Sequence, residues 1–248
     1  MRILEITLTI ITFIAIWQLS IYALQAPAFI LPSPLDVIIA LKAHLSLIMY
    51  HGSITLIEIL AGLLLGASLG GASAILFVYS NRLRKMVMPV IVFSQAIPVF
   101  ALAPILTLWM GYGISSKIFM SVLMIFFPVL SSFLDGLLRV ERDLIDLSHI
   151  MGASPKQQLL KLQIPYALPD LASGLRLGAV YAPIGAVVGE WVGASKGLGY
   201  LMLLSNGRGQ IDLMFSALLI LGIMAITLYL LMDQCAKTLE RYSQGIKS

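Results

Sequence analysis

Two acidic side chains, Glu58 and Glu190, fall inside long apolar stretches of this sequence. A charge in the hydrocarbon region of a membrane costs roughly 3 kcal/mol, so such a residue is by default a candidate for a solute pathway or gate. Each carboxyl lies near the predicted end of its apolar stretch, so contact with interfacial water is the alternative for both. We retain Glu190 as a candidate pathway residue.

A third apolar stretch contains the polar pair Ser94 and Gln95 together with Pro89, Pro98 and Pro104. Proline removes a backbone hydrogen-bond donor and displaces a carbonyl. Within a membrane, such breaks persist only where protein or a polar cavity satisfies the freed groups. This stretch is therefore predicted to line a pathway, with Ser94, Gln95 and Pro98 as the candidates. The hydroxyl and the carboxamide are suited to hydrogen bonding with an uncharged, aromatic ligand.

Other chemistry is missing from the sequence. It has no G-x-x-x-x-G-K-[ST] phosphate loop, and His44, His51 and His149 belong to no His/Asp/Glu cluster with metal-ligand spacing. The single cysteine, Cys235, excludes an internal disulfide framework and the cysteine-based metal patterns. We find no nucleophile–base pair within the apolar stretches. We therefore expect no catalytic residue, no metal site and no cofactor in this chain.

The composition indicates how these residues are positioned. Apolar residues make up 59% of the 248 residues and charged residues only 11%, against about 25% charged in soluble domains. The apolar stretches are roughly 20 residues long, enough to cross a bilayer as helices. We predict an all-α membrane protein with a single domain over residues 1–248. Six spans are expected, at about 3–24, 53–78, 86–110, 117–138, 172–193 and 213–232.

The distribution of basic residues predicts the orientation, because cytoplasmic loops are enriched in lysine and arginine. Twelve basic residues fall on the side that carries both termini and four on the other side. The four are Lys42, Lys117, Lys196 and Arg208. Both termini and residues 139–171 are therefore predicted to be cytoplasmic. The net charge of +4 then reflects membrane topology, and no nucleic-acid partner is needed to explain it.

Small residues recur at four-residue spacing in two of the predicted spans. Span two carries Gly62, Gly66 and Gly70, and span five carries Gly174 and Gly178 among others. Such spacing lets helix backbones approach closely where no water is available to drive association. Both spans are expected inside the bundle or at a dimer seam, and the sequence leaves these two positions open.

The least apolar segment, residues 139–171, is predicted to form two short helices joined by a sharp turn. The first helix runs from about 143 to 151 and ends at Gly152, a residue that readily adopts a left-handed cap. Ser154 is a good N-cap, and Pro155 occupies the first helical position, where its missing N–H is tolerated.

The second short helix is expected to end near Gln163, because Pro165 disfavours helix in the residue before it. Leucines and an isoleucine would give both helices apolar surface. Exposed apolar surface rimmed by charge is typical of an interaction site. We interpret the segment as a docking module for a partner protein; a helix pair packed only on its own bundle is the alternative.

The spacing of glycine and proline in segment 139–171 resembles a known motif. Gly152 is followed thirteen positions later by Pro165, with Leu162 and Ile164 before that proline. This pattern resembles the EAA loop of ATP-binding-cassette (ABC) importer permeases, E-A-A-x-x-x-G followed by nine residues and I-x-L-P. The head of the motif departs from the pattern, since Asp146 takes the acidic position and Leu147 and Ser148 replace the alanines. The resemblance implies contact with an ATPase for Asp146, Leu147, Gly152, Ala153, Pro155, Leu162 and Pro165.

The resemblance extends over most of the chain. It is carried by FILPSPLDV, SQAIPVFALAPILTLWMGYG, FFPVLSSFLDGL and APIGAVVGEWVGASKGLGYLM. These stretches are similar to permeases of the nitrate, sulfonate and taurine group, and within it to permeases for thiamine precursors of the hydroxymethylpyrimidine type.

This resemblance implies a six-helix type I importer fold with a cytoplasmic coupling helix–turn–helix in the bacterial inner membrane. It also implies a homodimer, an extracytoplasmic substrate-binding protein, and a separate ATPase that holds ATP and Mg. The chain is then a transport subunit, best matched to a thiamine pyrimidine precursor. A permease for aliphatic sulfonate, taurine or nitrate is the first alternative. An anion route would favour basic residues within the bundle, where only Arg176 is so placed. A passive channel or an intramembrane enzyme is the alternative from another class.

Overall fold

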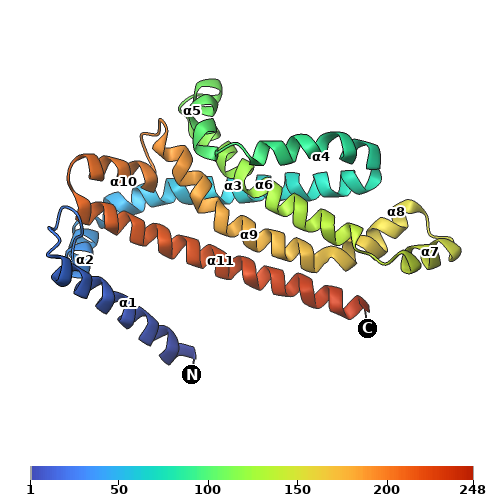
Figure 1. Cartoon of the computed structure of the whole chain (residues 1–248), viewed down its shortest axis with the longest axis horizontal. Coiled ribbons are helices and arrows are strands. Elements are labelled where there is room, and N and C mark those ends of the chain that lie inside the picture. Colours follow the sequence, from blue (N-terminus) through green and yellow to red (C-terminus); the bar gives the residue numbers. More distant parts are fainter. Residues whose placement is uncertain (1, 248) are drawn as a thin grey trace. The chain divides into compact units, whose positions relative to one another are not determined.

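The computed structural model describes residues 2–247, with side chains for residue 5 and residues 7–243 (Figure 1). Every regular element in this part of the chain is helical, so the predicted all-α class is confirmed. Among the described residues, five helices are long and apolar enough to cross a membrane, or six if the bent pair α4 (Asn81–Gln95) and α5 (Val99–Met110) counts as one span.

The chain forms two compact units. Unit 1 comprises Met1–Thr55 and Ser195–Ile223, and unit 2 comprises Leu56–Ala194 and Met224–Ser248. The assignment of residues 1–248 to one permease domain stays a prediction. The side chains of Arg2 and Lys247, both used to predict the orientation, lie outside the described residues.

Unit 1 contains three helices of its own: α1 (Arg2–Leu24), α2 (Pro34–Ala43) and α10 (Leu198–Gly207). Helix α2 begins with Pro34 at the first helical position, where its missing N–H is tolerated. Ser33 caps it by accepting a hydrogen bond from the Asp36 amide, and Asp36 accepts one from the Ser33 amide in return. This reciprocal capping box satisfies donors that the first helical turn leaves without partners.

Buried side chains of α3 (Leu45–Tyr79) hold the start of α10 within unit 1. The Gly197 amide donates to His51 Nδ1 at 3.0 Å, and the Leu198 amide donates to Thr55 Oγ1 at 2.8 Å. His51 is therefore a structural residue here. The two bonds satisfy backbone donors at the N-terminus of a helix that starts in apolar surroundings.

Unit 2 is built around α6 (Ile114–Leu138), α9 (Ile164–Trp191) and most of α3. It also contains α4, α5, α7 (Arg142–Ile150), α8 (Pro155–Gln158), a π-helical turn (Leu159–Gln163) and the last part of α11 (Ile211–Lys247).

Helix α6 lies between α3 and α9, and the small residues of both neighbours face it. A Cβ added to Gly66 would come within 2.9 Å of the Ile125 side chain, and one added to Gly174 within 3.1 Å of the Pro128 carbonyl. A Cβ at either position would force its neighbour on α6 to shift. The small-residue stripes predicted for the bundle interior or a dimer seam therefore pack inside one chain.

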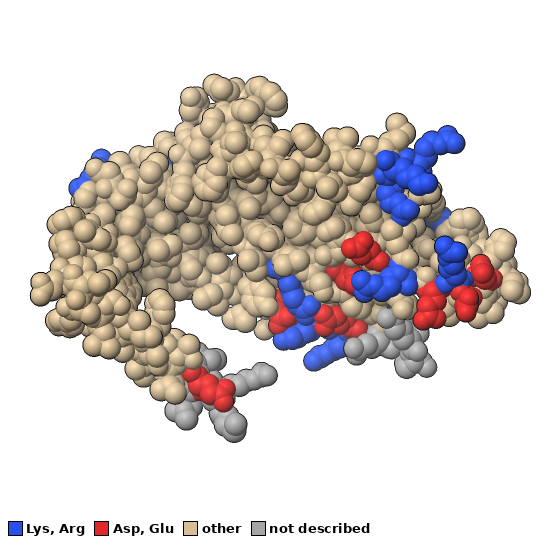
Figure 2. Space-filling model, in the orientation of Figure 1, with Lys and Arg blue, Asp and Glu red and all other residues tan. Residues whose placement is uncertain are grey.

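One end of unit 2 carries most of its charge. The end of α3, the start of α4, the end of α6 and the π-helical turn share one apolar cluster that includes Phe77, Leu83, Leu137 and Leu159. The basic α3–α4 turn therefore lies at the same end of unit 2 as α7 and α8. On the face in Figure 2, lysine, arginine, aspartate and glutamate gather at this end and in a second group at the lower centre of the view, and the rest of the unit is almost uncharged.

Several helix boundaries differ from those predicted. Helix α3 begins at Leu45 rather than 53, and α11 continues to Lys247 rather than 232. Both extensions are less apolar than the spans, so a prediction from hydropathy ends where the apolar stretch ends. The helix itself continues, because backbone hydrogen bonding extends until a residue breaks it.

Candidate functional site

The predicted docking module is present as α7, a glycine turn and α8. Helix α7 ends at Ile150, and Gly152 follows in the left-handed conformation with φ +83°. The Ala153 amide donates to the Ser148 carbonyl at 3.0 Å, which closes the turn as in a helix C-cap. Glycine is favoured here because a Cβ would strain the left-handed backbone.

Helix α8 starts with the predicted cap. The Gln157 amide donates to Ser154 Oγ at 3.3 Å, and the Ser154 amide donates to Gln157 Oε1 at 2.8 Å. Pro155 follows as the first helical residue. With the glycine turn before it, this capping box fixes the direction in which α8 leaves α7.

The prediction that Pro165 ends the second helix is wrong. Residues from Pro155 to Trp191 form one continuous helical stretch, interrupted only by the π-helical turn Leu159–Gln163. In that turn the Ile164 amide bonds to the Leu159 carbonyl, five residues back. A proline at 165 lacks an N–H and would press on the carbonyl four residues earlier. The wider turn relieves this conflict, so the module continues directly into α9.

The module presents apolar side chains that its own chain leaves uncovered. Ile150 is 81% exposed and Met151 is 79% exposed. Between α7 and α8 lies an open groove of about 450 Å³. Four residues expected to contact an ATPase line this groove: Leu147, Gly152, Ala153 and Leu162. Asp146 and Pro155 are exposed outside it, and Pro165 is half-buried at the start of α9.

A second candidate region lies where the predicted third span breaks. Helices α4 and α5 meet at 103°, so the span is bent at residues 96–98 and not continuous from 86 to 110 as expected. Pro98 is the N-cap residue of α5, while Pro89 and Pro104 lie inside helices. The bend frees backbone groups, and Ala96 and Pro98 are exposed.

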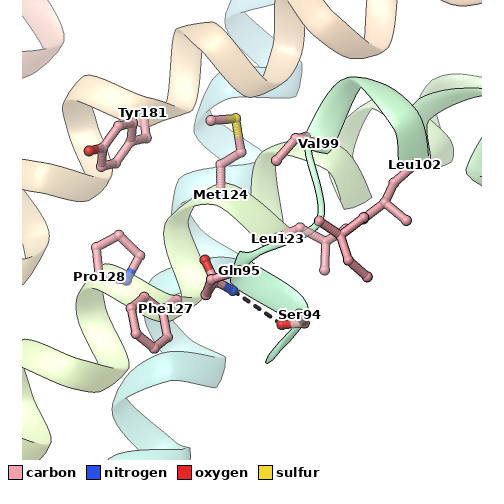
Figure 3. A pocket seen from close by; sticks show the side chains of 10 residues that line it. Ser94, Gln95, Val99, Leu102, Leu123, Met124, Phe127, Pro128 and Tyr181 are labelled. Carbon is pink, nitrogen blue, oxygen red and sulfur yellow. Dashed lines mark hydrogen bonds between the residues drawn. The ribbon is translucent and has the colours of Figure 1, made fainter. Parts of the chain in front are cut away.

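A cavity of about 220 Å³ opens beside this break (Figure 3). Its lining is uncharged and comes from α4, α5, α6 and α9: Ser94, Gln95, Ile97, Val99, Leu102, Leu123, Met124, Phe127, Pro128 and Tyr181. Gln95 Nε2 donates to Ser94 Oγ at 3.2 Å, and the Gln95 carboxamide oxygen points the other way, toward the side where Met124 and Tyr181 lie (Figure 3). Two of the four predicted pathway residues thus share one cavity.

The other two predicted pathway residues, Pro98 and Glu190, do not line that cavity. Glu190 is 1% exposed and Glu58 is 3% exposed, so neither reaches surrounding solvent in the described structure. Their carboxyl groups lie within hydrogen-bonding reach of each other, and both interact electrostatically with Lys117.

Lys117 is the functional candidate that could not be picked out from the sequence, where it counted only as one of the four basic residues on the side away from both termini. It is 2% exposed and lies on the first turn of α6. The predicted topology did contain a sign that Lys117 could lie near the two glutamates. Glu58 near the start of span two, Lys117 at the start of span four and Glu190 near the end of span five all fall at the same side of the membrane.

Residues 58–242 match the family model described as the binding-protein-dependent transport system inner membrane component. The chain belongs to this family. Its members are the transmembrane permease subunits of ABC importers, so this chain is a multi-pass membrane protein and a transport subunit, not an enzyme. The resemblance drawn from the glycine-to-proline motif is confirmed.

Named relatives cover nearly the whole permease. A probable ABC transporter permease protein of Haemophilus influenzae is 48% identical over 94% of this chain and 95% of its own. The formylaminopyrimidine transport permease protein ThiX of Halalkalibacterium halodurans is 40% identical over 90% of this chain and 92% of its own. Other relatives are named for riboflavin, aliphatic sulfonates and taurine.

The fold matches a solved ABC importer. An inward-facing structure of the MetNI methionine ABC transporter aligns with a TM-score of 0.62 at 22% identity, covering 73% of this chain and 93% of the other. The type I importer permease fold predicted for this chain is thereby confirmed. An ABC importer permease works with an ATPase and with a substrate-binding protein, and both are partners of this chain.

Proposed function

We propose that this permease subunit moves a thiamine pyrimidine precursor, a small uncharged heterocycle, in an ATP-driven importer. A permease for aliphatic sulfonate, taurine or nitrate is the alternative. The observation that carries the proposal is the uncharged cavity at the α4–α5 break, which combines a hydroxyl and a carboxamide with aromatic walls.

The chemistry of the lining favours a neutral ring compound. Ser94 and Gln95 offer hydrogen-bond donors and acceptors, and Phe127 and Tyr181 offer ring faces for stacking. Recognition of a sulfonate or nitrate would call for arginine, lysine or clustered amides, and the lining includes neither basic residue. The name of the relative ThiX, which refers to a formylaminopyrimidine, supports the same substrate class.

The size of the cavity narrows the class further. At about 220 Å³ it is smaller than the roughly 300–1,000 Å³ of sites for drug-sized ligands. A single substituted ring suits this volume better than a three-ring flavin with a ribityl chain. This comparison separates the proposed substrate from riboflavin, which also names a relative.

The module α7–α8 provides the route for ATP-driven movement. Asp146, Leu147, Gly152, Ala153, Pro155, Leu162 and Pro165 form or flank the surface that would dock in a cleft of the ATPase. ATP and Mg bind on that partner and not on this chain. Closure of the ATP-bound ATPase pair displaces α8, and α9 moves with it because the helix is continuous. Nucleotide shifts the inward- and outward-facing states only because its contacts differ between them.

The exposed break also supports a homodimer. Non-helical backbone at membrane depth is tolerated only where it is covered by protein or lines a water-filled cavity. In one chain Ser94, Gln95 and Pro98 are exposed. A second copy facing this surface would enclose the break and place two cavities around one pathway. The basic end of unit 2 then faces the cytoplasm of the bacterial cell, and the predicted orientation assigns both termini to the cytoplasm as well.

The test is substrate-dependent ATP hydrolysis by the reconstituted complex of permease, ATPase and binding protein. We expect hydroxymethyl- and formylaminopyrimidines to stimulate hydrolysis, and taurine, alkyl sulfonates, nitrate and riboflavin to leave it at the basal rate. Stimulation by a sulfonate, taurine or nitrate alone would replace the substrate assignment with the alternative. Failure of any ATPase to assemble with the chain would remove the coupling role of the module.

Two variants tie the result to the cavity. Gln95→Leu removes the carboxamide at similar size and is expected to reduce pyrimidine-stimulated hydrolysis by about tenfold, the value of one lost hydrogen bond of roughly 1.4 kcal/mol. Leu108→Ala on α5 is the matched control, because Leu108 is 75% exposed and lies outside the cavity lining. If Gln95→Leu and Leu108→Ala give the same pyrimidine-stimulated hydrolysis, the cavity does not recognise the substrate.

A further inference from the structure

The end of α9 farthest from the module is fastened to the turn between α5 and α6. Helix α9 has 28 residues, so its two ends are about 42 Å apart. At the far end, Thr107 Oγ1 on α5 donates to the Val192 carbonyl at 3.2 Å. Gly193 has φ +77°, and a Cβ there would lie 2.6 Å from the Tyr112 ring. The two segments are thus in direct contact.

Lys117 lies at the centre of this contact. Its Nζ donates to the Tyr112 carbonyl at 3.0 Å, to Ser116 Oγ at 3.2 Å and to the Gly193 carbonyl at 3.4 Å. One ammonium group therefore joins the α5–α6 turn to the segment that follows α9. The fit is close, because a Cβ added to Gly189 would come within 3.0 Å of the Lys117 Cα.

The charge of Lys117 is balanced within the same cluster. A buried ammonium is strongly unfavourable unless it is paired and hydrogen bonded. Glu58 on α3 and Glu190 on α9 interact with the ammonium electrostatically, and the two carbonyls and the Ser116 hydroxyl accept hydrogen bonds from it. The carboxyl groups stabilise the ammonium, whereas the carbonyls determine which segments the lysine joins.

We propose that Lys117 is a positioning residue that makes the far end of α9 and the α5–α6 turn move as one block. Displacement of α8 then reaches α5 through α9, and α5 carries the cavity residues Val99 and Leu102. Without this link, the end of α9 next to the module would move, but α5 would not move with it. The inference rests on the proposed coupling to an ATPase but not on the identity of the substrate.

Hydrogen–deuterium exchange on the reconstituted permease–ATPase complex tests the proposal. Exchange is compared without nucleotide and with ATP plus vanadate, and no transported substrate is needed. In the wild type we expect nucleotide to change exchange in the module, residues 142–158, and in the α5–α6 turn, residues 108–116. The two changes report movement at the two ends of α9.

The decisive variant is the double substitution Lys117→Met with Glu58→Gln, which removes the ammonium without leaving two buried carboxyls unbalanced. We expect the nucleotide-dependent change in exchange at the α5–α6 turn to fall at least about fivefold, the lower end of typical coupling between sites. The nucleotide-dependent change in exchange at the module should be retained. Thr107→Val removes only the neighbouring hydrogen bond to the Val192 carbonyl, so it should reduce the exchange response at the turn by less. This variant replaces the double variant if the latter fails to assemble.

Glu58→Gln alone is the matched control, because it removes one carboxyl group from the cluster but leaves the hydrogen bonds of Lys117. It should behave as the wild type. An unchanged response at the turn in the double variant would overturn the proposal. So would an effect of Glu58→Gln equal to that of the double variant, or a wild type that responds at the module alone. A wild type with no response at the module would instead contradict the proposed ATPase coupling.

Discussion

At the scale of single residues, Gly152 sets the angle between α7 and α8. A Cβ at this position would meet no atom within 4 Å, so Gly152→Ala strains the backbone alone. The left-handed conformation costs a residue with a Cβ about 1–2 kcal/mol. We expect the affinity of the permease for its ATPase to fall roughly 5–30-fold, measured by titrating the purified ATPase against permease in lipid nanodiscs.

Gly152→Asn is the control for this substitution. Asparagine adds a side chain but tolerates the left-handed region better than other residues. The affinity of the Gly152→Asn permease for its ATPase should stay near that of the wild type. Equal losses for alanine and asparagine would mean that the module tolerates no side chain at this turn, and that conformation is not the reason for the glycine.

Local signals at single residues could be predicted from the sequence, and distant partners could not. Gly152, Ser154 and Pro155 act through bonds within five residues, and all three adopt the predicted conformations. Lys117 is different, because its role depends on carbonyls up to 76 residues away. Its place at the start of a predicted span gave no local sign of the Gly193 carbonyl that it would bind.

At the scale of helices, two adjacent glycines of α3 differ in what surrounds them. A Cβ on Gly70 would lie 2.8 Å from the Phe126 carbonyl of α6, whereas a Cβ on Gly71 would meet nothing within 4 Å. Gly70→Ala forces the backbones of α3 and α6 apart and should destabilise the permease by about 1–3 kcal/mol. Gly71→Ala should raise stability slightly, by less than about 1 kcal/mol. Thermal unfolding in detergent compares the two variants.

Two arginines form ion pairs that hold α9 to its neighbours, and the two side chains differ in exposure. Arg176 bonds to Asp233 at 2.8 Å and to Glu240 at 2.7 Å on α11, with its side chain 21% exposed. Arg139 pairs with Asp170 at 3.1 Å but is 66% exposed. Arg176→Gln removes this shared cation, although Asp233 keeps Lys237 as a partner, and should destabilise the permease more than loss of the exposed Arg139 pair does.

Arg139→Gln is the comparison for the exposed pair and should change stability by less than about 1 kcal/mol. Both variants are followed by chemical unfolding in the same detergent. A larger effect at Arg139 than at Arg176 would contradict the view that α11 is fixed to α9 mainly through this partly buried arginine.

Helix existence could be predicted from hydropathy, but helix endings could not. All six apolar stretches are helical, with the third one bent. The error at Pro165 arose because proline is read as a stop, while a π-helical turn accommodates it without ending the helix. Nothing in the local sequence distinguishes these two outcomes, because the apolar contacts of Leu159 with the α3–α4–α6 cluster stabilise the continuous form.

At the scale of the whole molecule, the proposed orientation predicts which side of the membrane each loop faces. In a Cys235→Ser background, Lys156→Cys should react with a membrane-impermeant maleimide only in inverted vesicles. Arg208→Cys should react only in right-side-out vesicles. Both positions are exposed, and the basic residues that surround Lys156 favour the cytoplasmic side.

Permeabilised vesicles provide the control, because both cysteines should then be labelled equally. Labelling of Lys156→Cys from the outside would reverse the orientation and place the module where no ATPase could reach it. The sequence predicts this orientation from charge alone. The cavity was less accessible to prediction, because it requires α4, α5, α6 and α9 to meet at a bend that composition does not reveal.

The π-helical turn between α8 and α9 also limits how this chain can vary through evolution. A helix advances about 100° with each residue, so deleting one residue from Leu159–Gln163 would convert the wide turn into a regular one. The docking face would then point away from its partner, although every side chain that forms it remained. We therefore expect the length of this segment to be fixed across the family even where its residues differ, with insertions and deletions accumulating elsewhere.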